Sequence, residues 1–171
     1  MKNENKIEIM LNKYENIPYP KIPKLYPNKR YAIMLYNNFA GEFGELSAIT
    51  QYIYENIDLE NNNDISSILL KISVQEMKHL QLIGKILVAL GEKPYYQDMN
   101  KKAWSSKNIK YCTGNIKEMM KHNIYLEEMA ISEYKKATRF TRNIELRRIF
   151  ERIIMDEINH IEVFKKIGNI K

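Results

Sequence analysis

The chain has 171 residues, 44% of them hydrophobic and 28% charged, with a formal net charge of +6. This length suits one globular domain with a sizeable core. No apolar run reaches the roughly 20 residues of a membrane-spanning helix, and the polar start lacks the apolar stretch of a secretory signal. Cys112 is the only cysteine, which excludes an internal disulfide and a cysteine-based metal cluster within one chain. We therefore expect a cytoplasmic protein without a membrane segment.

The positive charge is concentrated in two stretches, 101–121 and 135–152. Basic surface attracts nucleic acids and acidic membranes. No recognition motif accompanies these lysines and arginines, so we expect them to lie on solvated helix faces. Nucleic acid is the partner that we expect least, and its binding would weaken steeply with salt.

Residues 1–29 differ from the rest of the chain because prolines recur in them and favour an extended conformation. The aromatic and apolar residues between the prolines predict that this arm lies on the folded domain or on a neighbouring subunit. We therefore expect a proline-rich arm over 1–29 and a helical domain over 30–171. The prolines of the arm are Pro18, Pro20, Pro23 and Pro27.

From about residue 30 onward, apolar residues recur with the period of an α-helix. The first predicted helix carries Glu45 and Tyr52 on one stripe. Asp64 offers an N-cap to the second helix, and Gly91 with Pro94 ends it. We expect these two helices to form a hairpin.

Residues 92–114 lack a sustained period and predict a long connection. A third helix follows with Glu127 and Tyr134 on one face, and a fourth carries Glu157 and His160 within an apolar stripe. The sequence shows no strand pattern. Two helices, a long crossover and two more helices are the layout of a ferritin-like four-helix bundle, so we predict an all-α fold of this kind.

The two halves of the helical part repeat one another. Residues 45–52 (ELSAITQY) align with 127–134 (EEMAISEY), 82 positions later. Residues 76–79 (EMKH) align with 157–160 (EINH), 81 positions later. A duplicated hairpin places its copies around a pseudo-twofold axis, so we expect the matching carboxylates to meet at the centre of the bundle.

A glutamate precedes a histidine by three residues on two of the predicted helices. That spacing puts both side chains on one helix face, where the carboxylate can bridge two ions and the imidazole can bind one. The alternative without a metal site is an exposed polar helix face. These glutamates, however, lie in apolar stripes, and a glutamate is almost never fully buried there unless it has a partner. Four carboxylates also balance the charge of two divalent cations. With one glutamate from each remaining helix, the predicted ligands are Glu45, Glu76, His79, Glu127, Glu157 and His160.

Two tyrosines lie seven residues after predicted ligands, on the same stripes. Tyr52 follows Glu45, and Tyr134 follows Glu127. Their hydroxyl groups are suited to hydrogen bonds that orient the ligands, and packing of buried aromatic rings is the equal alternative. Glu128 is adjacent to Glu127, but the register of the repeat favours Glu127 as the inward residue.

These segments resemble those of ferritin-like proteins. Residues 44–48 and 76–84, with the proline-rich arm, resemble manganese catalases and related spore-coat proteins. Residues 75–79 and 156–161 are similar to bacterioferritin and rubrerythrin. The resemblance implies a dinuclear centre that reacts with hydrogen peroxide or dioxygen, a homo-oligomer (a dimer or larger), and association with spores as an alternative location.

The chain also departs from these families. Rubrerythrins carry a rubredoxin-like module with four cysteines, which is missing here, so any electron donor would be a separate protein. Manganese catalases usually continue beyond the fourth helix, whereas this chain stops at Lys171. In bacterioferritin the methionine after the helix-two glutamate binds haem; Met77 occupies that place, and haem binding is left open.

The leading hypothesis is an oxidoreductase with two metal ions, iron or manganese. Carboxylate and imidazole suit both metals, so the ligands do not separate a peroxidase or ferroxidase from a manganese-catalase-like enzyme. The alternative is a non-catalytic subunit, for iron storage or for a structure that metal stabilises.

Overall fold

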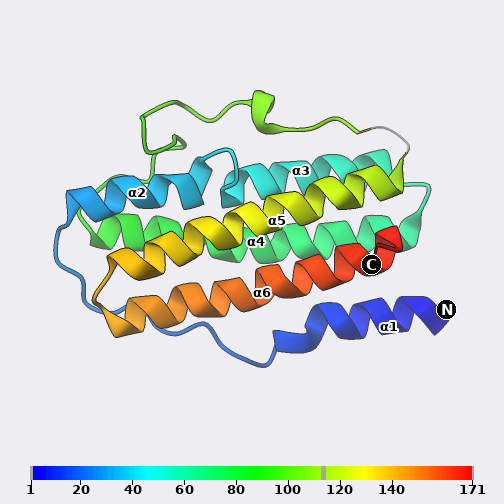
Figure 1. The fold of residues 1–171 in the computed structure, drawn as a ribbon, viewed down its shortest axis with the longest axis horizontal. Helices are drawn as coiled ribbons and strands as arrows, with labels where there is room; N and C mark the ends of the chain where they lie inside the picture. Colours follow the sequence, from blue (N-terminus) through cyan, green and yellow to red (C-terminus); the bar gives the residue numbers. More distant parts are fainter. Residues whose placement is uncertain (1, 113–114, 171) are drawn as a thin grey trace.

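In the computed structural model, which describes residues 2–112 and 115–170, long helices lie side by side around one core (Figure 1). Residues 1, 113–114 and 171, which belong to the predicted arm, connection and bundle, lie outside the described residues. The β-type pairing among the described residues is one isolated bridge, between Gln97 and Ala103. The helices are α1 (Lys2–Leu11), α2 (Lys29–Ala40), α3 (Glu45–Asp58), α4 (Asn63–Ala89), α5 (Ile116–Phe140) and α6 (Ile144–Gly168), with the 3-10 turns η1 (Asn12–Tyr14) and η2 (Ser106–Asn108).

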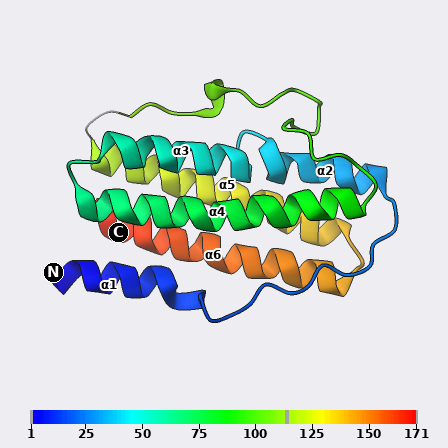
Figure 2. The same ribbon diagram turned by 180° about the vertical axis from the view of Figure 1, so that it is seen from behind.

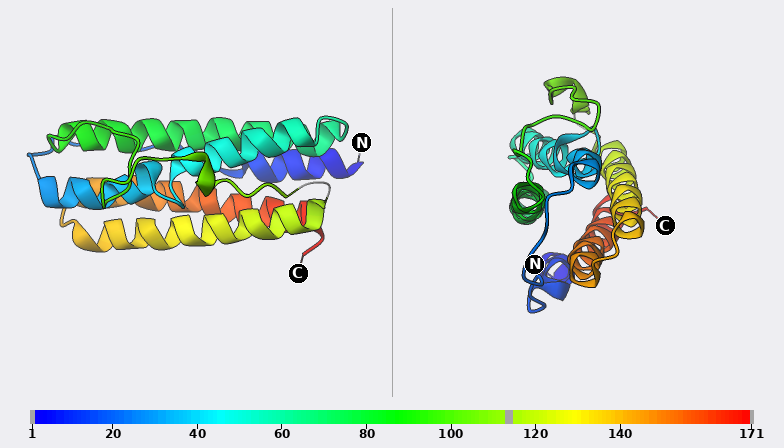
Figure 3. Two further views of the ribbon diagram at one scale, coloured as in Figure 1. Left: turned by 90° about the horizontal axis from the view of Figure 1, so that it is seen from above. Right: turned by 90° about the vertical axis from the view of Figure 1, so that its left-hand side faces the viewer.

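Helices α3 and α4 form one hairpin and α5 and α6 form the other. Helices α4 and α5 run in the same direction, so the chain between them returns along the length of the bundle (Figures 1 and 2). The end-on view of Figure 3 shows the paired helices around a common centre. The predicted all-α bundle with one long crossover is thereby confirmed.

The first predicted helix is broken into α2 and α3, which follow one another along the same side of the bundle (Figure 1). Gly44 lies at the break, and a Cβ there would overlap the carbonyl oxygens of Asn37 and Asn38. The Ser47 hydroxyl donates to the carbonyl oxygen of Gly41 at 2.8 Å and closes the turn. Because α3 restarts at Glu45, this carboxylate lies in a first helical turn, where the helix dipole favours negative charge.

Asparagine side chains begin three of the helices. Asn28, Asn115 and Asn143 accept a hydrogen bond from the backbone N–H three residues later. The prediction that Asp64 caps the second helix was wrong, because Asn62 holds the N-cap position and Asp64 lies within the first turn. An acidic side chain there still suits the positive end of the helix dipole.

The prediction of an extended arm was wrong for residues 2–11, which form α1 alongside α6 (Figures 1 and 2). All four prolines follow this helix, so none of them opposes it. Leu11 is buried, and Ile7 and Met10 pack against the same apolar cluster as Leu11. Residues 18–28 form neither helix nor strand, and Ile22 packs against the bundle.

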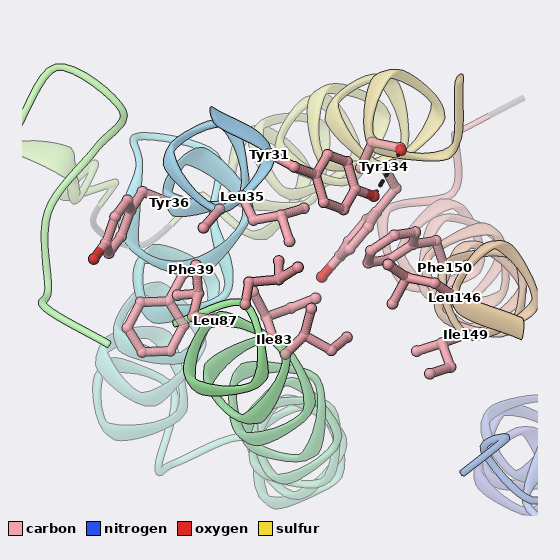
Figure 4. Close-up of a cluster of buried hydrophobic side chains, with 14 of the residues drawn as sticks. Tyr31, Leu35, Tyr36, Phe39, Ile83, Leu87, Tyr134, Leu146, Ile149 and Phe150 are labelled. Atoms are coloured by element: carbon pink, nitrogen blue, oxygen red, sulfur yellow. Dashed lines mark hydrogen bonds between the residues drawn. The ribbon is translucent and has the colours of Figure 1, made fainter. Parts of the chain in front are cut away.

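Two apolar clusters fill the bundle, one towards each end. The first includes Leu35, Ile83, Tyr134 and Phe150, which converge from α2, α4, α5 and α6 (Figure 4). The residues of the second come from α1, from α3 and the position after it, and from α4, α5 and α6: Leu11, Tyr52, Leu59, Ile68, Leu69, Ile72, Met119, Met120, Ile124, Val163 and Phe164. On both α4 and α6 the buried residues of the two clusters leave a gap of nearly three helical turns, residues 73–82 and 154–162. The EMKH and EINH segments lie in those gaps.

A buried polar group ties the crossover to the bundle. The side chain of Gln51 pairs with the backbone of Lys110, donating to its carbonyl oxygen and accepting from its N–H, each at 2.9 Å. Gln51 also donates to Glu55 at 2.9 Å, and Asn123 donates to the other oxygen of Glu55 at 2.5 Å. Burial raises the pKa of Glu55 to about 7, although both amides act to lower it.

The effect of Glu55→Gln on the free energy of unfolding is expected to be more favourable at pH 8 than at pH 5 by about 2–3 kcal/mol, because glutamine does not ionise. The folded-state pKa of Glu55 lies above the unfolded value, so its contribution is fully present below pH 4.5 and is lost as the pH rises through 7. Denaturant unfolding of both proteins at pH 5 and pH 8 measures the difference. An equal effect at both pH values would contradict this account of Glu55.

Candidate metal centre

The six predicted ligands lie together between the two apolar clusters. One group of four brings together Glu45, Glu76, His79 and Glu157, and a second brings together Glu76, Glu127, Glu157 and His160. Within each group, one ligand atom from every residue lies within 4.8 Å of the others. Two carboxylates, Glu76 and Glu157, belong to both groups, so the structure contains two adjacent positions that share a pair of glutamates.

His79 faces the first position through Nδ1. This atom lies 2.9 Å from Oε2 of Glu76, 3.1 Å from Oε1 of Glu157 and 3.7 Å from Oε2 of Glu45. Its other ring nitrogen points away from these three glutamates, towards Asp156 and Tyr19 outside the group.

His160 faces the second position in the same way. Its Nδ1 lies 2.8 Å from Oε1 of Glu76, 3.0 Å from Oε2 of Glu157 and 3.4 Å from Oε1 of Glu127. Since each shared carboxylate offers one oxygen to each position, the geometry matches carboxylates that bridge two ions and imidazoles that each bind one.

Burial and mutual repulsion disturb the protonation of these groups. Burial raises the pKa of Glu45 well above its ordinary value, and it raises the pKa of Glu127 to about 8 with the help of the charge on Glu76. Burial acts to lower the pKa of both histidines, but the carboxylates around them raise it instead. For Glu76, burial acts to raise the pKa, and the two histidines outweigh it and hold the pKa low. Without cations, the centre therefore holds protons in their place.

Metal ions would satisfy the buried polar atoms of the centre better than these atoms satisfy one another. All six side chains are at most 3% exposed, and Oε1 of Glu76, both oxygens of Glu157 and Nδ1 of His160 make close charge contacts but no hydrogen bond of good geometry. Such buried polar atoms are costly unless something satisfies them. Carboxylate and imidazole are the ligands of divalent manganese and iron, and two such cations would satisfy these atoms and balance four glutamates.

Tyr52 and Tyr134 are fully buried, and each contacts a glutamate of the opposite hairpin. The Tyr52 hydroxyl donates to Oε1 of Glu127 at 2.6 Å. The Tyr134 hydroxyl donates to Oε1 of Glu45. Both rings also belong to the apolar clusters, so each tyrosine packs in the core and also donates a hydrogen bond to a glutamate.

Sequence reasoning missed three residues around His79. Its outward Nε2 lies 3.2 Å from Oδ2 of Asp156 and 3.0 Å from the hydroxyl of Tyr19, which itself donates to Asp156 at 2.7 Å. Arg152 pairs with Asp156 at 2.5 Å. Asp156 directly precedes a predicted ligand in a buried stripe, which was a usable signal. Tyr19 was not detectable, because only the path of the arm brings it to the bundle.

A small cavity of about 10 Å³ reaches the centre from the side of α3 and α5. Glu42, Phe43 and Gly44 line it on one side, and Ala130 lines it on the other. Its volume is about that of one water-sized probe, so it suits very small molecules. None of the described helices is long and apolar enough to span a membrane.

The fold has counterparts in known proteins. A "Probable manganese catalase" of Clostridium acetobutylicum is 22% identical over 83% of this chain and 72% of its own length. The manganese catalase KatB of Anabaena superposes with a TM-score of 0.79 and 25% identity, over 88% of this chain and 75% of that one. The bacterioferritin of Desulfovibrio desulfuricans, whose structure contains a diiron site, superposes with a TM-score of 0.68 and 22% identity, over 82% of this chain and 78% of that one; this likeness concerns the fold.

The family model for rubrerythrin matches residues 34–168. This match includes all six predicted ligands and the crossover, and it extends from within α2 to the last residue of α6. With a carboxylate and histidine site for two metal ions at its centre, the chain belongs to the rubrerythrin family of ferritin-like proteins.

Proposed function

We propose that this protein is an oxidoreductase that holds two manganese or iron ions and reacts with hydrogen peroxide. The ligands in this proposal are Glu45, Glu76, His79, Glu127, Glu157 and His160. The observation that carries it is the sharing of Glu76 and Glu157 between the two groups of four. Two ions held by common carboxylates are close enough to act on one small oxygen compound.

Peroxide disproportionation is the reaction that we favour for this centre. One peroxide is oxidised to dioxygen, and a second is reduced to two waters, so no external electron donor is consumed. Bound manganese or iron ions supply the two-electron exchange with the oxygen–oxygen bond. The likeness to a manganese catalase at 25% identity supports peroxide as the substrate.

The residues of the chain position and shield this chemistry. Tyr52 and Tyr134 hold Glu127 and Glu45, the two glutamates that each belong to one position only. The apolar clusters at both sides exclude bulk water, which strengthens the electrostatic interactions within the centre. The narrow cavity beside Phe43 borders the centre and has room only for a very small molecule, which is consistent with a substrate such as peroxide.

Peroxide assays on separately manganese-loaded and iron-loaded protein test the proposal. We expect dioxygen release at one molecule for every two peroxides consumed in the manganese-loaded form. Peroxide consumption without dioxygen release, dependent on an added electron donor, would indicate a peroxidase with an external partner instead. No turnover with either metal would contradict the oxidoreductase. Size-exclusion chromatography with light scattering then distinguishes a dimer from a storage shell, the non-catalytic alternative.

A further inference from the structure

The two histidines present the same atom to the metal positions but have different partners on their outer sides. Nε2 of His79 contacts Oδ2 of Asp156 at 3.2 Å, whereas Nε2 of His160 contacts the amide oxygen Oε1 of Gln75 at 3.2 Å. Asp156 and Gln75 occupy equivalent places in the internal repeat, since each directly precedes a shared glutamate. The repeat therefore places a carboxylate behind one histidine and a neutral amide behind the other.

Several contacts hold the side chain of Asp156 in a fixed position. It is 1% exposed, and Oδ2 accepts from the hydroxyl of Tyr19 at 2.7 Å while Nη1 of Arg152 lies 2.5 Å away. The guanidinium of Arg152 is itself fixed by the N-terminal arm, because it donates to the carbonyl oxygens of Tyr14 at 2.8 Å and Ile17 at 3.0 Å. Its centre also lies 4.7 Å from the ring of Tyr19. The arm thus completes the surroundings of His79.

Within the described ranges, the outer side of His160 carries no carboxylate, although Tyr19 interacts with Gln75 there as well. Gln75 is half-buried, and it lines a cavity of about 700 Å³ between the arm, α4 and α6. Among the described residues, no charged side chain contacts Nε2 of His160. A carboxylate behind a metal-binding imidazole fixes its orientation and strengthens its bond to the cation, and loss of such a partner typically costs about 10–100-fold in affinity.

We propose that the two metal positions are unequal, and that the position of Glu45 and His79 binds its ion at least about tenfold more tightly than that of Glu127 and His160. Asp156 acts as a positioning residue through His79, and Tyr19 and Arg152 hold Asp156 in place. The inference rests on the six-residue centre proposed above but not on its reaction with peroxide.

Calorimetric titration of the metal-free protein with Mn²⁺ is the first test. We expect two binding steps whose affinities differ by about tenfold or more. Crystals grown with one equivalent of Mn²⁺ should show their anomalous signal beside Glu45 and His79. Two equal steps, or a first ion beside His160, would overturn the inequality and leave the centre itself standing. Absence of any binding would overturn both.

Two substitutions of matched size separate the outer partners. Asp156→Asn should lower the affinity for the first ion about tenfold and change the affinity for the second ion little. Gln75→Glu should raise the affinity for the second ion and so reduce the difference between the two affinities. Tyr19→Phe removes a hydroxyl that contacts His79 and Asp156 directly and reaches His160 only through Gln75, so it should weaken binding of the first ion by a few-fold and affect binding of the second ion less. If Asp156→Asn unfolds because Arg152 loses its partner, Gln75→Glu and Tyr19→Phe still test whether the outer contacts set the two affinities. Equal effects of Tyr19→Phe on both steps, or no effect of Gln75→Glu on the second, would overturn the role of these outer contacts.

Discussion

Glu76→Gln is expected to lose both metal ions, whereas Glu127→Gln is expected to lose only one. Glu76 lies in both groups of four, and Glu127 lies in one. Removal of even an outer partner of a metal ligand lowers affinity by about 10–100-fold, so loss of a shared ligand should cost at least 100-fold for each ion. Elemental analysis of the purified variants measures the ions retained, and peroxide turnover of Glu76→Gln should fall by about the same factor.

Glu128→Gln is the matched control for these variants. Glu128 follows Glu127 directly on α5, but its side chain is exposed and belongs to neither group. The control should keep two ions and full turnover. If Glu76→Gln also retained two ions, or if Glu128→Gln lost them, the assignment of ligands would be wrong. Thermal unfolding of all three variants in chelator shows whether each one is folded.

Removal of the metal ions is expected to lower the melting temperature by about 15 °C or more at pH 7.5. An ion present at 1,000 times its dissociation constant stabilises a protein by about 4 kcal/mol, and two ions contribute about twice that. In a chain of this length, 1 kcal/mol shifts the melting temperature by about 2–4 °C. Scanning calorimetry with and without chelator measures the change. Glu76→Gln should show almost no response to chelator, and an unchanged melting temperature of the natural chain would contradict a metal-filled core.

The metal-free protein should also lose stability as the pH rises from 5 to 9. Burial raises the folded-state pKa of Glu127 to about 8, above its ordinary value of 4.5. Its stabilising contribution is therefore complete below pH 4.5 and is lost as the pH rises through 8. The pKa of His79 and the pKa of His160 are also raised in the folded state. The stabilising contribution of these histidines is therefore likewise lost at alkaline pH. Because metal displaces these protons, the loss of melting temperature on chelation should grow between pH 6 and pH 8.5.

Much of the architecture was predictable from local patterns. The helical period, the unpatterned stretch 92–114 and the repeat of Glu45–Tyr52 in Glu127–Tyr134 predicted four helices with one crossover. The break between α2 and α3 was harder to predict, because the apolar period continues through it. A glycine marks a site that tolerates a break, but it does not require one. The break forms where the backbone at Gly44 comes so close to Asn37 and Asn38 that only glycine fits.

Helical spacing and the internal repeat were enough to predict that six glutamate and histidine side chains meet on one axis. The contacts on the outer sides of the two histidines depend on the tertiary fold. Tyr19 meets His79 across 60 positions of sequence and Asp156 across 137, along an arm without a regular period. Spacing predicts contacts where a helix fixes the geometry, whereas contacts made by an irregular segment depend on the whole folded surface beneath it.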